Sequence, residues 1–235
     1  MEKPENENRI ATMFDKVAPK YDLLNALLSF RQDKRWRKKL VQHSPQGTQL
    51  SYLDVATGTG DVLIQLAKSH NQAKRFVGID ISQEMLRIAE TKSKNKNAQG
   101  NISFAQMSAE KLSFPDQQFH CLSIAFGLRN TIDKEQALKE FYRVLKPGGT
   151  LLILEFFNPD NSFLAQAFQF YFHHILPKIG GLISDKEAYH YLPKSVSSFY
   201  SYQNLERILL DIGFEKQETN SFLFGSCRLL FFTKN

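Results

Sequence analysis

The sequence has little cysteine and no long apolar segment. Its two cysteines, Cys121 and Cys227, lie in separate apolar runs without metal-ligand spacing, so we expect two reduced core thiols and no disulfide framework. His173 and His174 are adjacent and His190 is remote, so the i, i+4 spacing of a helical metal pair is missing and we expect no metal site. No apolar run approaches the roughly 20 residues that cross a bilayer, and the N-terminus is polar. These absences predict a cytoplasmic protein, soluble or peripheral to a membrane.

Two stretches are unusual in composition. Residues 9–40 carry nine basic and three acidic side chains, a difference equal to the whole net charge of +6, and they place Trp36 among five cations. This stretch is either a solvated helix face or a surface for an anionic membrane or a nucleic acid. Residues 162–176 are rich in Phe, with the apolar side chains on one helical arc. That arc belongs either to a core helix or to a lid over a long apolar substrate.

Strands and helices alternate through the rest of the chain. We expect strands at 52–56, 75–80, 102–106, 119–126 and 150–156, with helices at 61–70, 82–93 and 133–145. A helical segment at 9–42 precedes them, and a helix at 203–212 and strands at 214–222 and 226–233 follow. Ser82 is the expected N-cap of the helix at 82–93. The alternation predicts an α/β fold with a doubly wound, mainly parallel sheet.

The most informative segment is the glycine turn at 52–61. An apolar strand leads into Gly58 and Gly60, which permit positive φ and let a ligand lie against the backbone. Twenty residues after Gly60 a second apolar strand ends in Asp80, whose carboxylate can accept both hydroxyls of a ribose. The pattern predicts a nucleoside site at the edge of a parallel sheet.

The residues around the glycines indicate which nucleoside binds. A dinucleotide fingerprint needs a third small residue where this chain has Leu63, which argues against NAD or FAD. Asp54 and Asp61 make the turn acidic, which disfavours a pyrophosphate and suits the ammonium and sulfonium groups of S-adenosylmethionine. We therefore expect S-adenosylmethionine; a nucleotide-binding oxidoreductase and a non-catalytic binding module remain as alternatives. The sequence 126–128 lacks the Pro-Pro-aromatic motif of amino-directed nucleic-acid methyltransferases, so we expect no nucleic acid partner.

Four further segments are distinctive: Met13–Asp22, Phe126–Asn130, Tyr142–Gly149 and Ala188–Pro193. Together they resemble the quinone-ring C-methyltransferases of menaquinone and ubiquinone biosynthesis, the UbiE/MenG group, over nearly the whole chain. The resemblance implies a seven-stranded, Rossmann-like class I methyltransferase fold in a single domain. We divide the domain into an N-terminal helical cover (1–50), a cofactor-binding core (51–156), a Phe-rich helical lid (157–202), and a C-terminal helix with a strand pair (203–235).

The resemblance also implies which residues contact the cofactor, with Ser108 and Ala109 near the adenine. It also implies contacts at Thr59 and Asp80. The full set of candidate cofactor residues is Asp54, Gly58, Thr59, Gly60, Asp80, Ile81, Ser108, Ala109 and Ala125. This chain departs from the family at a few positions. The family usually has Asp or Asn at Ser108, often Ser at Ala125, and tends to have Gly at Arg31 and Glu at Lys194.

The implied reaction restricts the substrate. Quinone carbons are electrophilic, so only the reduced quinol can donate electrons to a methyl group. Arg129 and Asn130 follow the fourth strand, where ligands of α/β proteins collect, and are candidates to orient the ring. Tyr21 and Asp61 are candidates for proton handling. We expect a polyprenylated demethylmenaquinol substrate, with the methoxybenzoquinol of ubiquinone synthesis as the alternative, and peripheral contact with an anionic membrane; the sequence leaves the oligomeric state open.

Overall fold

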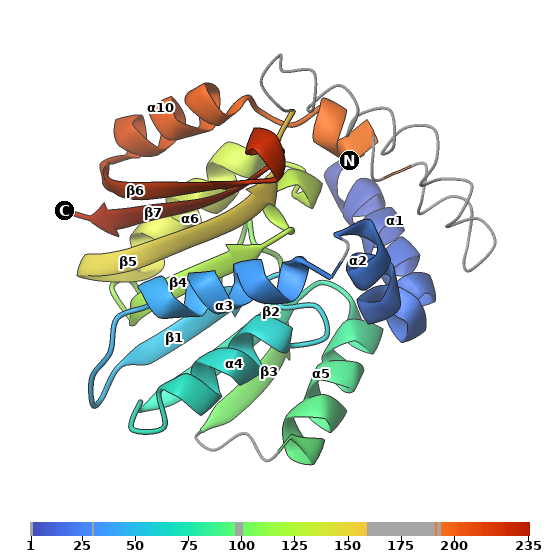
Figure 1. Ribbon diagram of the computed structural model, residues 1–235, viewed down its shortest axis with the longest axis horizontal. Coiled ribbons are helices and arrows are strands. Elements are labelled where there is room, and N and C mark those ends of the chain that lie inside the picture. The colour runs from blue at the N-terminus through green and yellow to red at the C-terminus, as the bar shows by residue number, and fades with distance from the viewer. Residues whose placement is uncertain (1, 30, 97–100, 159–190, 192–193) are drawn as a thin grey trace.

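The computed structural model describes residues 2–29, 31–96, 101–158, 191 and 194–235. Its centre is a seven-stranded sheet in the order β3-β2-β1-β4-β5-β7-β6 (Figure 1). The strands are β1 (Ser51–Val55), β2 (Arg75–Asp80), β3 (Ile102–Gln106), β4 (Phe119–Ala125), β5 (Leu145–Phe156), β6 (Phe214–Phe222) and β7 (Cys227–Lys234). The first five are parallel to one another, and β7 is antiparallel to both β5 and β6. This arrangement confirms the mainly parallel, doubly wound sheet.

Helices cover both faces of the sheet. Helices α3 (Asp33–His43) and α4 (Asp61–Ser69) lie on one face, and α6 (Lys134–Val144) and α10 (Tyr202–Ile212) lie on the other (Figure 1). Alternate residues of β5 supply the two cores: Leu151 faces the α6 and α10 side, and Leu152 faces the α3 and α4 side. Because both faces are covered, the central strands read as continuous apolar runs.

The turn after α6 differs from the expected loop. We predicted a helix to 145 and a strand from 150, whereas α6 ends at Val144 and β5 begins at Leu145. The pairing of β4 with β5 shifts register between Phe119 and Cys121, and Gly148 takes a φ of +73°. The Lys-Pro-Gly-Gly segment is therefore an irregularity inside the strand pairing, which glycine permits.

The N-terminal cover begins earlier than position 9. Helix α1 spans Glu2–Val17, a 3₁₀ turn η1 (Ala18–Lys20) contains Pro19, and α2 spans Tyr21–Leu28. Pro4 lies in the first turn of α1, where its missing N–H costs nothing. Helix α1 packs against α5 (Gln83–Asn95) at the sheet edge where the parallel strands end (Figure 1). The expected Phe-rich lid falls mostly on residues 159–190, outside the described residues.

The cationic stretch is divided between core and surface. Trp36 is only 4% exposed and stacks on Phe222 at 5.8 Å between ring centroids. Arg37 is also buried, whereas Lys34, Arg35 and Lys38 are exposed. The idea of an aromatic residue among five surface cations is therefore wrong for Trp36 and Arg37, because one face of α3 packs on the sheet.

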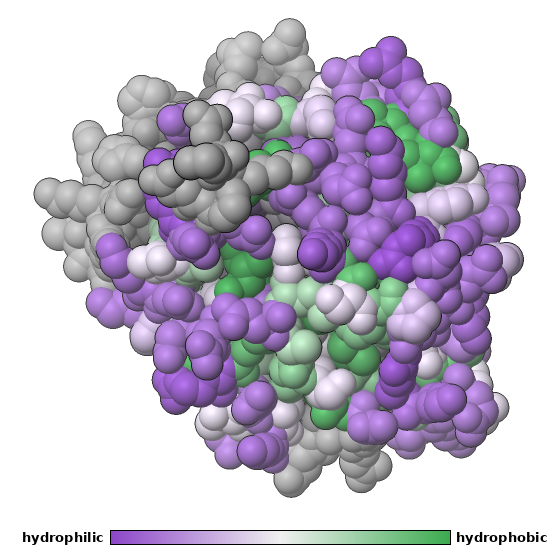
Figure 2. All heavy atoms as spheres, turned by 180° about the vertical axis from the view of Figure 1, so that it is seen from behind, coloured by the Kyte–Doolittle hydropathy of each residue, from purple (hydrophilic) through white to green (hydrophobic). Residues whose placement is uncertain are grey.

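The remaining surface is mixed. Figure 2 shows the face opposite α3, where hydrophilic residues dominate and the hydrophobic ones form separate patches. Within the described ranges, no helix combines the length and apolarity needed to span a bilayer. Cys121 and Cys227 are buried free thiols, as expected, and burial raises the pKa of each.

Candidate cofactor and substrate site

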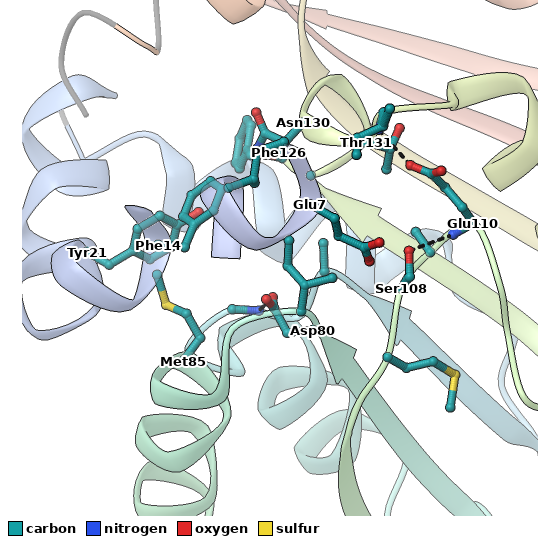
Figure 3. Close-up of a pocket in the computed structure, with 18 residues that line it drawn as sticks. Glu7, Phe14, Tyr21, Asp80, Met85, Ser108, Glu110, Phe126, Asn130 and Thr131 are labelled. Atoms are coloured by element: carbon teal, nitrogen blue, oxygen red, sulfur yellow. Dashed lines mark hydrogen bonds between the residues drawn. The ribbon is translucent and has the colours of Figure 1, made fainter. Parts of the chain in front are cut away.

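A cavity of about 660 Å³, counting its open mouth, lies where β1, β2 and β4 end beneath α1 (Figure 3). The cover helices contribute Glu7, Ile10, Phe14 and Tyr21 to its lining. The sheet side contributes Ala56, Gly58, Asp80, Ile81, Met85, Met107, Ser108, Ala109, Glu110, Phe126, Gly127, Asn130, Thr131 and Ile132. Segments far apart in the sequence therefore build one site at the carboxyl ends of parallel strands, which is the usual ligand position in such sheets.

The glycine turn brings the backbone to the cavity. Gly58 and Gly60 have φ values of +55° and +80°, so both need the left-handed conformation that favours glycine. Gly60 precedes α4 and no side chain caps that helix. The N-terminal N–H groups of α4 consequently keep hydrogen-bonding capacity at the turn, and the helix dipole favours negative charge there.

Asp80 lies at the end of β2, as predicted, and is 8% exposed. Its Oδ2 accepts from the Gly58 N–H at 2.8 Å and its Oδ1 accepts from the Ser82 N–H at 2.9 Å. Burial raises the pKa of Asp80 although these hydrogen bonds oppose the shift. The carboxylate thus holds the turn and the start of α5 together while it faces the cavity. Ser82 is the expected N-cap, since its Oγ accepts from the Met85 N–H at 3.1 Å.

A second cavity of about 310 Å³ adjoins the first and shares Tyr21, Ala56 and Gly58 with it. Its other lining residues are Arg37, Asp54, Thr57, Thr59, Asp61, Val62 and Ala125. Asp54 is buried and accepts hydrogen bonds of 2.6 Å from both Thr57 and Ser123. Burial nevertheless raises the pKa of Asp54 to about 6. Expected cofactor residues thus divide between two neighbouring cavities that meet at Tyr21.

The acidic character expected of the turn is largely neutralised. Asp61 lies 2.7 Å from the Arg37 Nη1 and 2.8 Å from the Lys92 Nζ. Burial alone would raise the pKa of Asp61, but the charges of Arg37 and Lys92 outweigh burial and hold it below its usual range. Lys92 also pairs with Asp22 of α2 at 2.6 Å. Asp61 is therefore an ionised group inside an ion-pair network that ties the cover to the core.

Arg129 and Asn130 are neighbours in the sequence, but their side chains have different surroundings. Asn130 lines the main cavity, and its buried Oδ1 has no hydrogen-bond partner within the described chain. Arg129 is not among the lining residues; its Nη1 lies 2.7 Å from Glu155 Oε1, and its Nε donates to Ser195 at 3.3 Å. A direct contact between Arg129 and a ligand stays a prediction that this geometry does not favour.

Several lining residues were not anticipated. Ser108 and Ala109, which the resemblance implies lie near the adenine, line the cavity, but Glu110 beside them was missed. The Glu110 carboxylate accepts from the backbone N–H groups of Ile132 and Asp133, at 2.6 and 3.0 Å. Glu7 of α1 also lines the cavity. No local pattern marks either glutamate, because each reaches the site only through tertiary packing. Among the described residues, no group of three His, Cys, Asp or Glu side chains is arranged to hold a metal.

Comparisons with known proteins agree with this geometry. The sequence profile of the ubiE/COQ5 methyltransferase family matches residues 2–234. The ubiquinone/menaquinone biosynthesis C-methyltransferase UbiE of Geotalea daltonii is 40% identical over 224 residues, which cover 94% of this chain and 94% of that protein. The structure of a SAM-dependent methyltransferase from Aquifex aeolicus matches with a TM-score of 0.64 and 20% identity, over 90% of this chain and 97% of that one.

The [4+2]-cyclase SpnF gives a TM-score of 0.71 at 16% identity, over 96% of this chain and 94% of that one. These two structural likenesses concern the fold alone, because one fold can carry different reactions.

Proposed function

Because the chain belongs to the ubiE/COQ5 methyltransferase family, we propose that it methylates a ring carbon of demethylmenaquinol in the last step of menaquinone biosynthesis. The coarser activity, C-methyl transfer in quinone biosynthesis, follows from the family and from the 40% identity to UbiE of Geotalea daltonii. The alternative acceptor is the polyprenyl-methoxybenzoquinol of ubiquinone biosynthesis. The chemistry is the same for both rings.

The methyl donor is S-adenosylmethionine, and the lining residues fit it. Asp80 offers buried carboxylate oxygens to the ribose hydroxyls, and Ser108 and Ala109 lie beyond it for the adenine. The second cavity, with Asp54 and Thr59, suits the methionine part, because a carboxylate attracts its ammonium group. When bound, the cofactor supplies a methyl group on a positively charged sulfur. The protein then needs to align a nucleophile and exclude water.

One observation carries the substrate assignment: the buried Oδ1 of Asn130 has no partner within the described chain. Such an acceptor costs free energy unless a ligand satisfies it. The apolar side chains of Phe14, Phe126 and Ile132 line the same cavity. A hydroxylated aromatic ring matches both features, since its hydroxyl can donate to Asn130 while its face contacts apolar groups.

Loss of the phenolic proton makes the adjacent ring carbon nucleophilic. Tyr21 lines both cavities and is our candidate for handling that proton. Asp61, held ionised in the second cavity, is the other. We propose that Arg129 acts on the substrate through its neighbour Asn130.

The experiment compares oxidised and reduced acceptors. Methyl transfer from isotopically labelled S-adenosylmethionine should require a reductant, and mass spectrometry should find the label on ring carbon. Asn130→Ala should lower turnover at least about tenfold and leave S-adenosylhomocysteine affinity within about twofold. Asn101→Ala, at an exposed position, is the matched control. Equal activity on the oxidised quinone, or label recovered as a methyl ether, would refute the proposal.

The acceptor ring needs a separate measurement. We expect kcat/KM for demethylmenaquinol to exceed that for the methoxybenzoquinol by about tenfold or more at equal prenyl length. The opposite order would select the ubiquinone alternative and leave the C-methylation chemistry intact.

We also propose that the enzyme is cytoplasmic and reaches its lipid substrate at an anionic membrane surface. The exposed cations Lys34, Arg35 and Lys38 on α3 support this partner, and each cation near such a surface contributes about 1 kcal/mol. Sedimentation with anionic vesicles should recover the protein at low salt and lose it at high salt. Lys34→Glu with Lys38→Glu should weaken recovery more than Lys94→Glu on α5 does. Equal recovery with neutral vesicles would contradict the proposal.

A further inference from the structure

Three carboxylates line the main cavity, and two of them already accept hydrogen bonds from backbone N–H groups. Asp80 accepts from the backbone N–H groups of Gly58 and Ser82. Glu110 accepts from the backbone at positions 132 and 133. These two side chains complete the turns around the cavity.

The third carboxylate, Glu7, is in a different position. It projects from α1 into the cavity, toward the side that Ser108 and Glu110 line (Figure 3). The side chain is half-buried, and within the described chain no hydrogen bond or ion pair engages it. A partly buried carboxylate that lines a cavity and has no donor among the described residues is available to accept a hydrogen bond from a ligand.

The chemistry of adenosine indicates which hydrogen-bond donor the Glu7 carboxylate would meet. Asp80 suits the ribose hydroxyls, and the loop that follows β3 suits the purine. The only strong hydrogen-bond donor on the adenine base is its 6-amino group. Ser108 is neutral, and its Oγ already accepts from the Glu110 N–H at 3.4 Å. On that side of the cavity Glu110 already accepts from two backbone N–H groups, so Glu7 is the anionic acceptor without a donor there among the described residues.

We propose that Glu7 accepts a hydrogen bond from the 6-amino group of the adenine and selects for that group. The proposal rests on the cofactor orientation given above. It assigns a recognition role to the N-terminal cover, because α1 would then contact the cofactor directly. A 6-oxo purine would present an oxygen to the carboxylate and be repelled.

Calorimetric binding of S-adenosylhomocysteine tests this without turnover. The comparison ligand carries hydrogen in place of the 6-amino group. The wild-type protein should prefer S-adenosylhomocysteine by about tenfold, a change typical of one charge-assisted hydrogen bond. Glu7→Ala should lose about tenfold in affinity for S-adenosylhomocysteine and bind the 6-hydrogen analogue within about twofold of wild type. Glu7→Gln, which keeps an acceptor oxygen, should retain part of the preference.

Glu90→Ala is the control, since it removes one exposed carboxylate from α5 that is not among the lining residues. It should change neither dissociation constant by more than about twofold. Equal losses of both ligands in Glu7→Ala, or no loss, would overturn the role of Glu7 while leaving the methyltransferase assignment in place. If the wild-type protein bound neither ligand, the result would refute the cofactor orientation on which this proposal rests.

Discussion

The guanidinium of Arg129 and the carboxylate of Glu155 form a buried ion pair with an Nη1–Oε1 distance of 2.7 Å. Glu155 is fully buried in β5, and its second oxygen accepts from the Arg129 N–H at 3.2 Å. The same guanidinium donates to the carbonyl of Phe126. The pair therefore holds the segment between β4 and the 3₁₀ turn η2 (Leu128–Asn130), from which Asn130 reaches the cavity.

Removing one partner of this ion pair should lower the stability of the fold. Glu155→Ala leaves the Arg129 charge buried and unpaired, so the free energy of unfolding should fall by about 3–5 kcal/mol. Denaturant titration measures this change. In Glu155→Gln, a milder variant, turnover should fall by a larger factor than affinity for S-adenosylhomocysteine, since Asn130 is displaced and Asp80 is not.

The exposed pair of Glu84 and Arg87 is the matched control, with side chains 45% and 66% exposed. Glu84→Ala should cost less than about 1 kcal/mol. A similar cost at both pairs would contradict the positional role assigned to Glu155.

Asp80→Ala should weaken cofactor binding. The substitution removes a carboxylate acceptor, and such hydrogen bonds contribute about 1.5–3 kcal/mol, so the dissociation constant should rise roughly tenfold or more. Calorimetry provides the constant, and circular dichroism checks that the fold survives. Unchanged binding by folded Asp80→Ala would remove Asp80 from the cofactor site.

Asp54 should make stability depend on pH. Burial raises its pKa in the folded protein to about 6, above the ordinary aspartate value of 3.8. Between these pH values the folded state binds more protons than the unfolded state, so this group stabilises the protein at low pH and loses that contribution as pH rises through about 6. Asp54→Asn removes the effect. The variant should therefore gain roughly 2–3 kcal/mol relative to wild type between pH 4 and 7, measured by denaturant unfolding without cofactor. A difference that does not change with pH would contradict the assignment.

Arg31 adopts a φ of +61°, a conformation that costs most L residues about 1–2 kcal/mol. Glycine avoids this cost but loses more entropy on folding. Arg31→Gly should therefore raise the free energy of unfolding by about 0.5–1 kcal/mol. Arg31→Ala removes the same charge and keeps the Cβ, so its unfolding should show no comparable gain. Equal stabilisation by both variants would show that loss of the Arg31 charge, and not relief of the backbone conformation, causes the gain.

The sequence by itself determined the sheet, the glycine turn and the position of Asp80. These features depend on short-range patterns: apolar runs of strand length, glycines that permit positive φ, and an acid at a strand end. It also indicated the family, because each distinctive segment is a continuous run of residues that can be recognised without the fold. The start of β5 was misplaced, because strand pairing with β4 extends through a turn that looks like a break.

Only the tertiary structure decided how the charged groups are paired. Arg129 was expected to face a ligand, but Glu155, 26 positions away, takes its guanidinium. Asp61 was expected to make the turn acidic, but Arg37 from a separate helix compensates it. Glu7 reached the cavity with no local pattern to mark it. Partners of this kind are set by how helices pack across the sheet edge, and electrostatic contacts between distant residues leave no periodicity in the sequence.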